Sequence, residues 1–227
     1  MRKLDNTEVK KYILNILCEF AAFCDQNGLR YYLSGGTLLG AVRHKGFIPW
    51  DDDVDLLMPR PDFDKLHDLL RKGNIRPYYK LISLQMGNSF WPFAKIIDTR
   101  TYVKNEYSNV DQHLWIDIFP MDGLPDDKEE SDILLSKAEP LKKWINRCSA
   151  TIGKGKGFVR SIVKIPMILF LRMYTPERFG RKLDKLAHQY DFDKQEYIGG
   201  VAWSLGPNER MKKKEYLPYN DVEFCGK

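Results

Sequence analysis

The stretch from residue 33 to residue 58 constrains this chain more than any other. A short apolar strand runs into a Ser-Gly-Gly turn at residues 34–36, and a helix is expected over residues 37–43. Four aspartates then fall within residues 51–55 and lead into a second expected strand, residues 53–58. Glycines at a strand-to-helix turn let backbone amides approach a phosphate, so the turn is a candidate phosphate site.

The aspartates after this turn have the spacing of a metal site. Asp53 and Asp55 alternate along the expected strand and should share one face, because side chains repeat every two residues. Asp117 lies inside another apolar strand, residues 113–119. A buried carboxylate without a partner costs several kcal/mol, so Asp117 should meet a cation or a hydrogen-bond network. The residues alone therefore indicate phosphoryl transfer.

Three alternatives compete for the aspartate run. Asp51, Asp53 and Asp55 begin like an EF-hand, but Leu56 stands where that loop needs Gly and Asp62 where it needs Glu, so calcium binding of this kind is excluded. A solvated acidic turn remains open. A metal-dependent sugar-nucleotide glycosyltransferase, which also uses an Asp-x-Asp pair, remains open as well.

The first half of the chain reads as α/β with mixed strands. A helix is expected with Thr7 as its N-cap and Gly28 as its stop, and another from Pro61 to Gly73. The remaining strand patterns fall at residues 80–85, 93–97, 102–104 and 113–119. The last is expected to be closed by Pro120 and a turn at Asp122-Gly123.

The second half is helical and basic. We expect helices over residues 126–150, interrupted at Pro140, and 175–189, and strands over residues 196–203 and 221–224. Residues 158–174 have an apolar run of about ten residues flanked by Lys and Arg, too short to cross a bilayer, which takes ~20. A contact with a membrane surface through residues 154–174 is one interpretation of this pattern, and core packing is the other.

Composition narrows the setting. The net charge of +5 is unevenly distributed, with residues 141–186 strongly basic and residues 51–68 acidic. The four cysteines form no CxxC pair, and the polar N-terminus has no apolar signal core. We therefore expect a cytoplasmic protein with free thiols, peripheral at the inner face of the membrane, and no nucleic-acid partner.

Residues 33–58, together with WPFAKIIDTRT at 91–101 and WIDIFPMDGLP at 115–125, closely resemble the LicD family. These are phosphocholine transferases with a nucleotidyltransferase-type fold, related to the fukutin-type transferases of animals. The resemblance implies a catalytic core over residues 1–125, a mixed sheet flanked by helices, followed by a basic helical extension over residues 126–227.

The resemblance weakens toward the C-terminus. The family element Phe-Glu-Gly reads Phe224-Cys225-Gly226 here, and the family pattern continues further. We therefore expect the C-terminal part to be incomplete. A catalytically inactive, membrane-associated protein that binds nucleotide or glycan is the corresponding alternative function.

By resemblance, the chain transfers phosphocholine or a related phospho-alcohol from CDP-choline or a similar CDP-alcohol to a glycan hydroxyl, releasing CMP. The acceptor would be a cell-surface glycan such as lipopolysaccharide, teichoic acid or capsule, and the cofactor Mg²⁺ or Mn²⁺. The implied metal ligands are Asp53, Asp55 and Asp117, with Asp117 or Asp51 as general base. The expected donor-binding residues are Ser34, Gly35, Gly36, Thr37, Arg43, His44, Lys45, Trp50 and Lys95.

Overall fold

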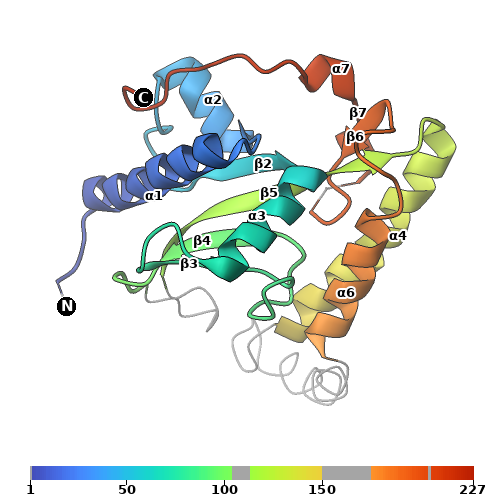
Figure 1. Ribbon diagram of the computed structural model, residues 1–227, viewed down its shortest axis with the longest axis horizontal. Coiled ribbons are helices and arrows are strands. Elements are labelled where there is room, and N and C mark those ends of the chain that lie inside the picture. Colours follow the sequence, from blue (N-terminus) through green and yellow to red (C-terminus); the bar gives the residue numbers. More distant parts are fainter. Residues whose placement is uncertain (1, 104–112, 150–174, 204–205) are drawn as a thin grey trace, which may run out of the picture.

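The computed structural model describes residues 2–103, 113–149, 175–203 and 206–227. Within these residues the chain forms one mixed sheet with helices packed on it and beside it (Figure 1). The predicted α/β class, a mixed sheet flanked by helices, is confirmed.

The sheet runs in the order β1-β2-β5-β4-β3, and β6 and β7 continue it from the far end of β5. Strands β2 and β5 are parallel, and every other described pair is antiparallel. The strands are β1 (Tyr32–Leu33), β2 (Asp55–Pro59), β3 (Tyr79–Ile82), β4 (Ala94–Asp98), β5 (Leu114–Leu124), β6 (Tyr197–Gly199) and β7 (Met211–Lys212).

Helix α1 (Asn6–Asn27) ends where its sequence predicts and begins two residues earlier. Gly28 takes the left-handed conformation that closes a helix, with φ of 60°. The N-cap is Asp5, whose carboxylate accepts from the amide of Glu8 at 2.9 Å while the Glu8 side chain accepts from the amide of Asp5. This reciprocal capping box makes the prediction of Thr7 as N-cap wrong.

The other helical segments are α2 (Gly35–His44), α3 (Arg60–Lys72), α4 (Lys128–Ser149), α6 (Pro176–Ala187), α7 (Lys213–Tyr216) and the short 3₁₀ turn η1 (Pro207–Glu209). Helix α4 runs through Pro140 as one element, so the helix does not restart there, and the prediction of a break at Pro140 is wrong in that respect. No helix among the described residues is long and apolar enough to cross a membrane. The glycine joint and residues 158–174 lie outside the described residues.

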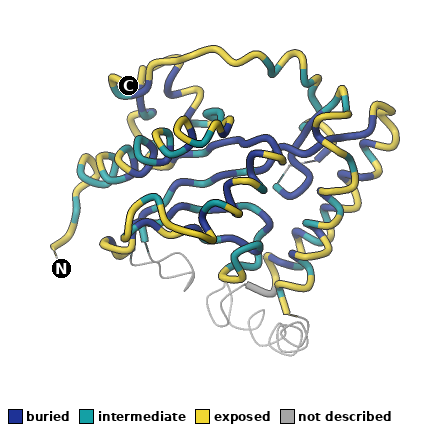
Figure 2. The backbone as a smooth tube through the Cα atoms, in the orientation of Figure 1, coloured by how far each residue is buried: buried dark blue, intermediate teal, exposed yellow. Residues whose placement is uncertain are grey.

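Helices α1 and α3 pack on one face of the sheet and bury it (Figure 2). Leu56 on β2, Ile96 on β4 and Ile118 on β5 point into this core and are at most 1% exposed. Their neighbours in sequence point to the opposite face, because side chains alternate along a strand. That opposite face carries the candidate site.

Strand β5 is longer than predicted. It passes Pro120 and pairs Asp122 with Gly199 and Leu124 with Tyr197 of β6. The Asp122-Gly123 sequence is therefore strand and not a turn. A side chain at Gly123 would meet the backbone of Tyr190 and Asp191 at 2.8–2.9 Å, so the glycine serves a close approach of two chain segments.

Helices α4 and α6 lie against each other beside the sheet and form a second apolar cluster (Figure 1). Strand β6 covers three residues of the predicted 196–203. Residues 102–103 and 221–224 form no strand, which corrects two further predictions.

The C-terminal strap, residues 217–227, runs back across the molecule to the turn that follows α2 (Figure 1). There the amide of Cys225 donates to the carbonyl of Lys45 at 2.6 Å. The ring of Phe224, 4% exposed, packs edge-on against Phe47 with centroids 5.0 Å apart. The strap thus holds the turn that leads into the aspartate run.

Candidate active site

The Ser-Gly-Gly turn opens α2 and is held against the start of β2. The amide of Ser34 donates to the carbonyl of Asp55 at 2.9 Å, and the amide of Asp55 donates to the Thr37 hydroxyl at 2.9 Å. Gly35 has φ of +49°, a conformation that favours glycine. The turn is therefore fixed relative to the carboxylate of Asp55.

Two aspartates lie at the beginning of α2. A side chain at Gly36 would come within 2.7 Å of Asp51 Oδ2, and one at Gly35 within 3.6 Å of Asp55 Oδ2. The first amides of a helix have no partner within the helix, and the helix dipole makes this end favourable for anions. A phosphate group bound here would lie close to both carboxylates.

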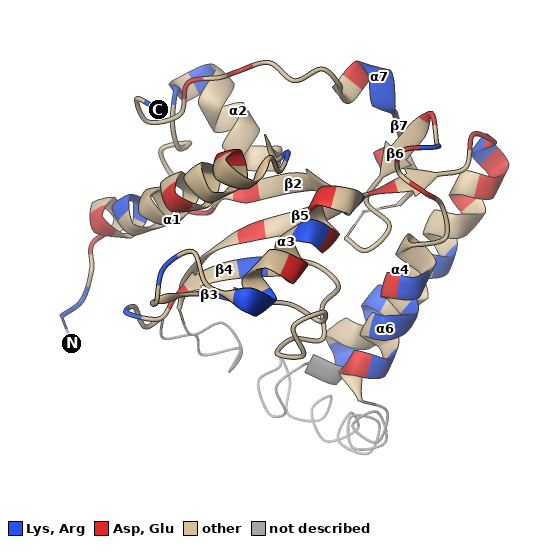
Figure 3. Cartoon of the chain, viewed as in Figure 1, with Lys and Arg blue, Asp and Glu red and all other residues tan. Residues whose placement is uncertain are grey.

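Three charged residues lie side by side across three neighbouring strands. Asp55 on β2 is the register partner of Asp117 on β5, and Asp117 is the register partner of Lys95 on β4. In Figure 3 acidic segments on β2 and β5 lie beside a basic segment on β4. We call Asp55, Asp117 and Lys95 the charged row.

Asp117 is held by residues on its own strand and on β4. The indole Nε1 of Trp115 donates to Asp117 Oδ2 at 2.7 Å, and Lys95 Nζ lies 3.6 Å from Asp117 Oδ1. Lys95 Nζ also lies 4.2 Å from the centre of the Trp115 ring, within cation–π range. The Asp117 and Lys95 side chains are only 15% and 16% exposed, so water screens their charges weakly.

The carboxylates of the site disfavour one another's charge. Partial burial, followed by the negative charges of Asp53, Asp117 and Asp51, raises the pKa of Asp55 to about 7. Burial and the neighbouring Asp51 also raise the pKa of Asp53. Raised carboxyl pKa values in a cluster are typical of functional sites, because a cation or a proton must relieve the repulsion.

The residues present fit Mg²⁺ when substrate phosphates complete the coordination. No group of three or more His, Cys, Asp or Glu side chains among the described residues gathers closely enough to hold a metal ion alone. Magnesium usually binds through one or two carboxylates together with phosphate oxygens and water. Asp55 and Asp117, with their mutual repulsion, supply such a pair.

A family model described as "LicD/FKTN/FKRP, nucleotidyltransferase domain" matches residues 28–146, which include the turn, the aspartate run and the charged row. The chain belongs to the LicD family. This confirms the resemblance drawn from the sequence blocks.

Individual relatives agree with this membership. The chain is 30% identical to the lipopolysaccharide cholinephosphotransferase LicD of Haemophilus influenzae over 235 residues, which cover all of this chain and 85% of the relative. It is 47% identical over 49 residues to the ribitol 5-phosphate transferase FKRP of Homo sapiens, which covers 22% of this chain and 8% of that protein.

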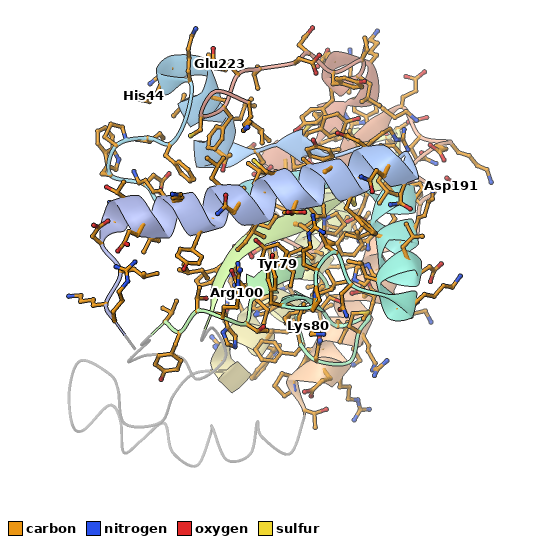
Figure 4. The ribbon with its side chains drawn as sticks, turned by 60° about the vertical axis from the view of Figure 1, so that its left-hand side comes forward. His44, Tyr79, Lys80, Arg100, Asp191 and Glu223 are labelled. Atoms are coloured by element: carbon orange, nitrogen blue, oxygen red, sulfur yellow. The ribbon has the colours of Figure 1, made fainter. Side chains whose placement is uncertain are left out.

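The basic triplet lies at the other end of α2 from the turn. Arg43 and His44 are exposed, and α2 is about 15 Å long at 1.5 Å per residue. Lys45 Nζ pairs with Glu223 of the C-terminal strap at 3.1 Å. Figure 4 shows His44 at this end of the helix, in the same region as Glu223. A phosphate contact by the triplet stays a prediction.

Two further predicted residues differ in their surroundings. Trp50, next to Asp51, is 83% exposed and so has room to contact a bound substrate. Asp53 is exposed and precedes β2, whereas the sequence placed it within the strand.

A cleft of about 680 Å³ lies between α1, β1 and the C-terminal strap, and no residue of the charged row lines it.

Sequence reasoning missed a set of four neighbouring aromatic rings on the face of the sheet that carries the charged row. Phe119 follows Asp117 by two residues on β5. Phe93 precedes Lys95 by two residues and lies immediately before β4. We call the four rings of this set the aromatic wall: Trp91, Phe93, Phe119 and Trp203. The alternation Trp115-Asp117-Phe119 in the sequence was the signal that could have revealed it.

Proposed function

We propose that this LicD family member transfers phosphocholine, or a comparable phospho-alcohol, from a CDP-activated donor to a hydroxyl of a glycan such as lipopolysaccharide, releasing CMP. The observation that carries the proposal is the charged row beside the turn at residues 34–36. The Haemophilus relative, whose match covers this whole chain, is named as a cholinephosphotransferase. That name supports the choice of phosphocholine.

In this proposal the donor diphosphate lies at the N-terminus of α2. The amides that open α2 contact its oxygens, and Lys95, fixed beside Asp117, contributes positive charge from the neighbouring strand. Phosphoryl transfer depends mainly on positioning and charge neutralisation, so no nucleophilic side chain is required.

Asp55 and Asp117 would hold Mg²⁺, with Asp53 as a further ligand and Mn²⁺ as the alternative ion. Bound there, the ion would supply positive charge that neutralises the diphosphate oxygens. The indole of Trp115 fixes the orientation of Asp117 through its 2.7 Å hydrogen bond. Asp117 or Asp51 takes the proton of the acceptor hydroxyl, and both lie within the carboxylate cluster.

The setting of the reaction is part of the same proposal. A glycan acceptor attached to lipid would place the enzyme at a membrane surface, with residues 154–174 as the contact. This segment lies outside the described residues, so its role rests on the pattern of apolar and basic residues in the sequence.

The test is turnover of CDP-choline with a lipopolysaccharide acceptor and Mg²⁺, measured as CMP release. Asp117→Asn keeps the shape of the side chain but removes its charge, and should lower kcat by about 100-fold or more. Asp132→Asn, a half-buried aspartate on α4 that pairs with Lys128, is the matched control and should leave turnover unchanged. Release of a nucleoside diphosphate from a sugar nucleotide, with no CMP from CDP-choline, would contradict the proposal and favour a glycosyltransferase.

A further inference from the structure

The aromatic wall runs parallel to the charged row on the face of the sheet opposite α1 and α3. Two of its rings, Phe119 and Trp203, also pack against a buried apolar cluster on that face, formed by Leu57, Met121, Phe192 and Ile198. Phe119 lies two residues beyond Asp117 on β5, and Phe93 lies two residues before Lys95, immediately ahead of β4. Two residues of extended chain correspond to roughly 6.6 Å. The ring centroids of Phe119 and Phe93 are 5.1 Å apart, which confirms that they lie together on this face. Both side chains are half-buried, so part of each ring remains accessible.

Two tryptophans extend the wall in both directions. Trp203 packs on Phe119 with centroids 5.4 Å apart, and Trp91 stacks on Phe93 at 5.3 Å with the ring planes 29° apart. The indole Nε1 of Trp203 already donates to the carbonyl of Pro120 at 2.7 Å. Phe93 and Phe119 carry no polar atom, so the middle of the wall offers aromatic surface without hydrogen-bonding groups.

We propose that the aromatic wall binds the quaternary ammonium group of the donor and thereby selects choline over uncharged alcohols. This inference rests on the proposed function. A phosphate held at the charged row leaves only a two-carbon linker before the nitrogen of choline. That linker is short enough to place the trimethylammonium over Phe119 and Phe93.

The chemistry of the wall fits this ligand better than a sugar or a polyol. A trimethylammonium group has no N–H to donate and is attracted to the faces of aromatic rings. A polyol carries hydroxyls whose hydrogen bonds to water would be lost against Phe93 and Phe119 without replacement.

The experiment compares two donors in the full chain with Mg²⁺ and a glycan acceptor. One is CDP-choline, and the other is a CDP-alcohol in which a neutral tert-butyl group replaces the trimethylammonium. We expect the wild type to prefer CDP-choline and Phe119→Leu to reduce that preference in kcat/KM by about tenfold. Phe119→Trp keeps an aromatic face and should retain the preference. Phe23→Leu, a half-buried ring on α1 at the opposite face of the sheet, is the matched control and should leave the preference unchanged.

The outcomes separate this inference from the proposed function. Turnover of CDP-choline with the same donor preference in Phe119→Leu and wild type would overturn the wall as the choline site. A raised KM for the glycan acceptor, with donor preference intact, would also overturn it and assign the wall to the acceptor. Absence of CDP-choline turnover in the wild type, with activity on a CDP-polyol, would instead overturn the proposed donor. Calorimetric binding of CDP-choline to folded Phe119→Leu provides a second measurement: Kd should rise about tenfold, and an unchanged Kd would overturn the inference.

Discussion

Replacing Asp55 by Asn should stabilise the cation-free protein above pH 7, although it removes a residue of the charged row. The Asp55 carboxylate accepts no hydrogen bond from a described residue, so the amide loses no described partner. What it removes is a negative charge that partial burial and then the neighbouring Asp53, Asp117 and Asp51 disfavour, against a smaller attraction from Lys95. A residue retained at a cost in stability is expected of a site that binds a cation.

The size of the gain follows from the pKa of Asp55. A rise from the ordinary 3.8 to about 7 sets a ceiling of about 4 kcal/mol on its destabilising effect. Because the carboxylate is partly exposed, solvent screening reduces this to about 1–2 kcal/mol. For a chain of this size the Tm should rise by about 2–6 °C.

The pH dependence has a defined sign. Between pH 3.8 and about 7 the folded chain keeps a proton on Asp55 that the unfolded chain has lost, so stability falls as pH rises through this window. The Asp55→Asn gain should therefore be small near pH 4 and complete above pH 7.

Thermal unfolding with and without Mg²⁺ measures both effects. Adding Mg²⁺ and CDP should raise the Tm of the wild type above pH 7 and leave Asp55→Asn nearly unchanged. Asp52→Asn, in the same run of aspartates but exposed, is the control. An unchanged or lower Tm for cation-free Asp55→Asn above pH 7 would refute the electrostatic reasoning.

Two further substitutions test the surroundings of the site. Gly35→Ala should cost about 1–2 kcal/mol of stability and also lower CMP release, because φ is +49° at the turn that holds the phosphate. Gly87→Ala, at a φ of +73° away from the site, should show the strain without the loss of activity, and equal losses would contradict the assignment. Asp122→Asn should lower the free energy of unfolding by about 1–3 kcal/mol in urea, since it removes the nearest counter-charge of the buried Arg60 guanidinium, at 2.6 Å, and leaves the more distant Asp184 and Asp64 at 3.7 and 3.9 Å. A cost below about 1 kcal/mol would show that Arg60 is compensated elsewhere.

The sequence predicted the parts of the site that depend on short-range patterns. The apolar pattern around Asp117 placed it inside a strand, and the structure confirms this. Gly28 and Gly73 bounded helices because a helix ends readily at glycine. The alternation within one strand does not reveal which strands are neighbours in the sheet. The sequence therefore did not predict that Lys95 lies beside Asp117 in the charged row.

Pro120 shows why the end of β5 was misjudged. The amide of Asp117 donates to the carbonyl of Val54, which precedes β2. Successive amides along a strand point to opposite sides, so the backbone nitrogen of residue 120 points away from β2, toward the side of β4. Strand β4 begins at Ala94, opposite Ile118, and offers no paired carbonyl at that point. Proline is tolerated there because the missing N–H has no ladder partner to lose. Only the sheet order reveals this, and local sequence does not contain it.

The parallel pairing of β2 and β5 makes the site resistant to one kind of genetic change. Inserting one residue between Leu114 and Trp115 would keep every residue of β5 but turn the side chains that follow the insertion to the opposite face. Trp115 and Phe119 would then enter the core where Ile116 and Ile118 belong. The alignment that buries the core is the same alignment that brings Asp117 beside Asp55. A one-residue insertion at this point would therefore prevent folding, and no folded enzyme with a displaced Asp117 would result.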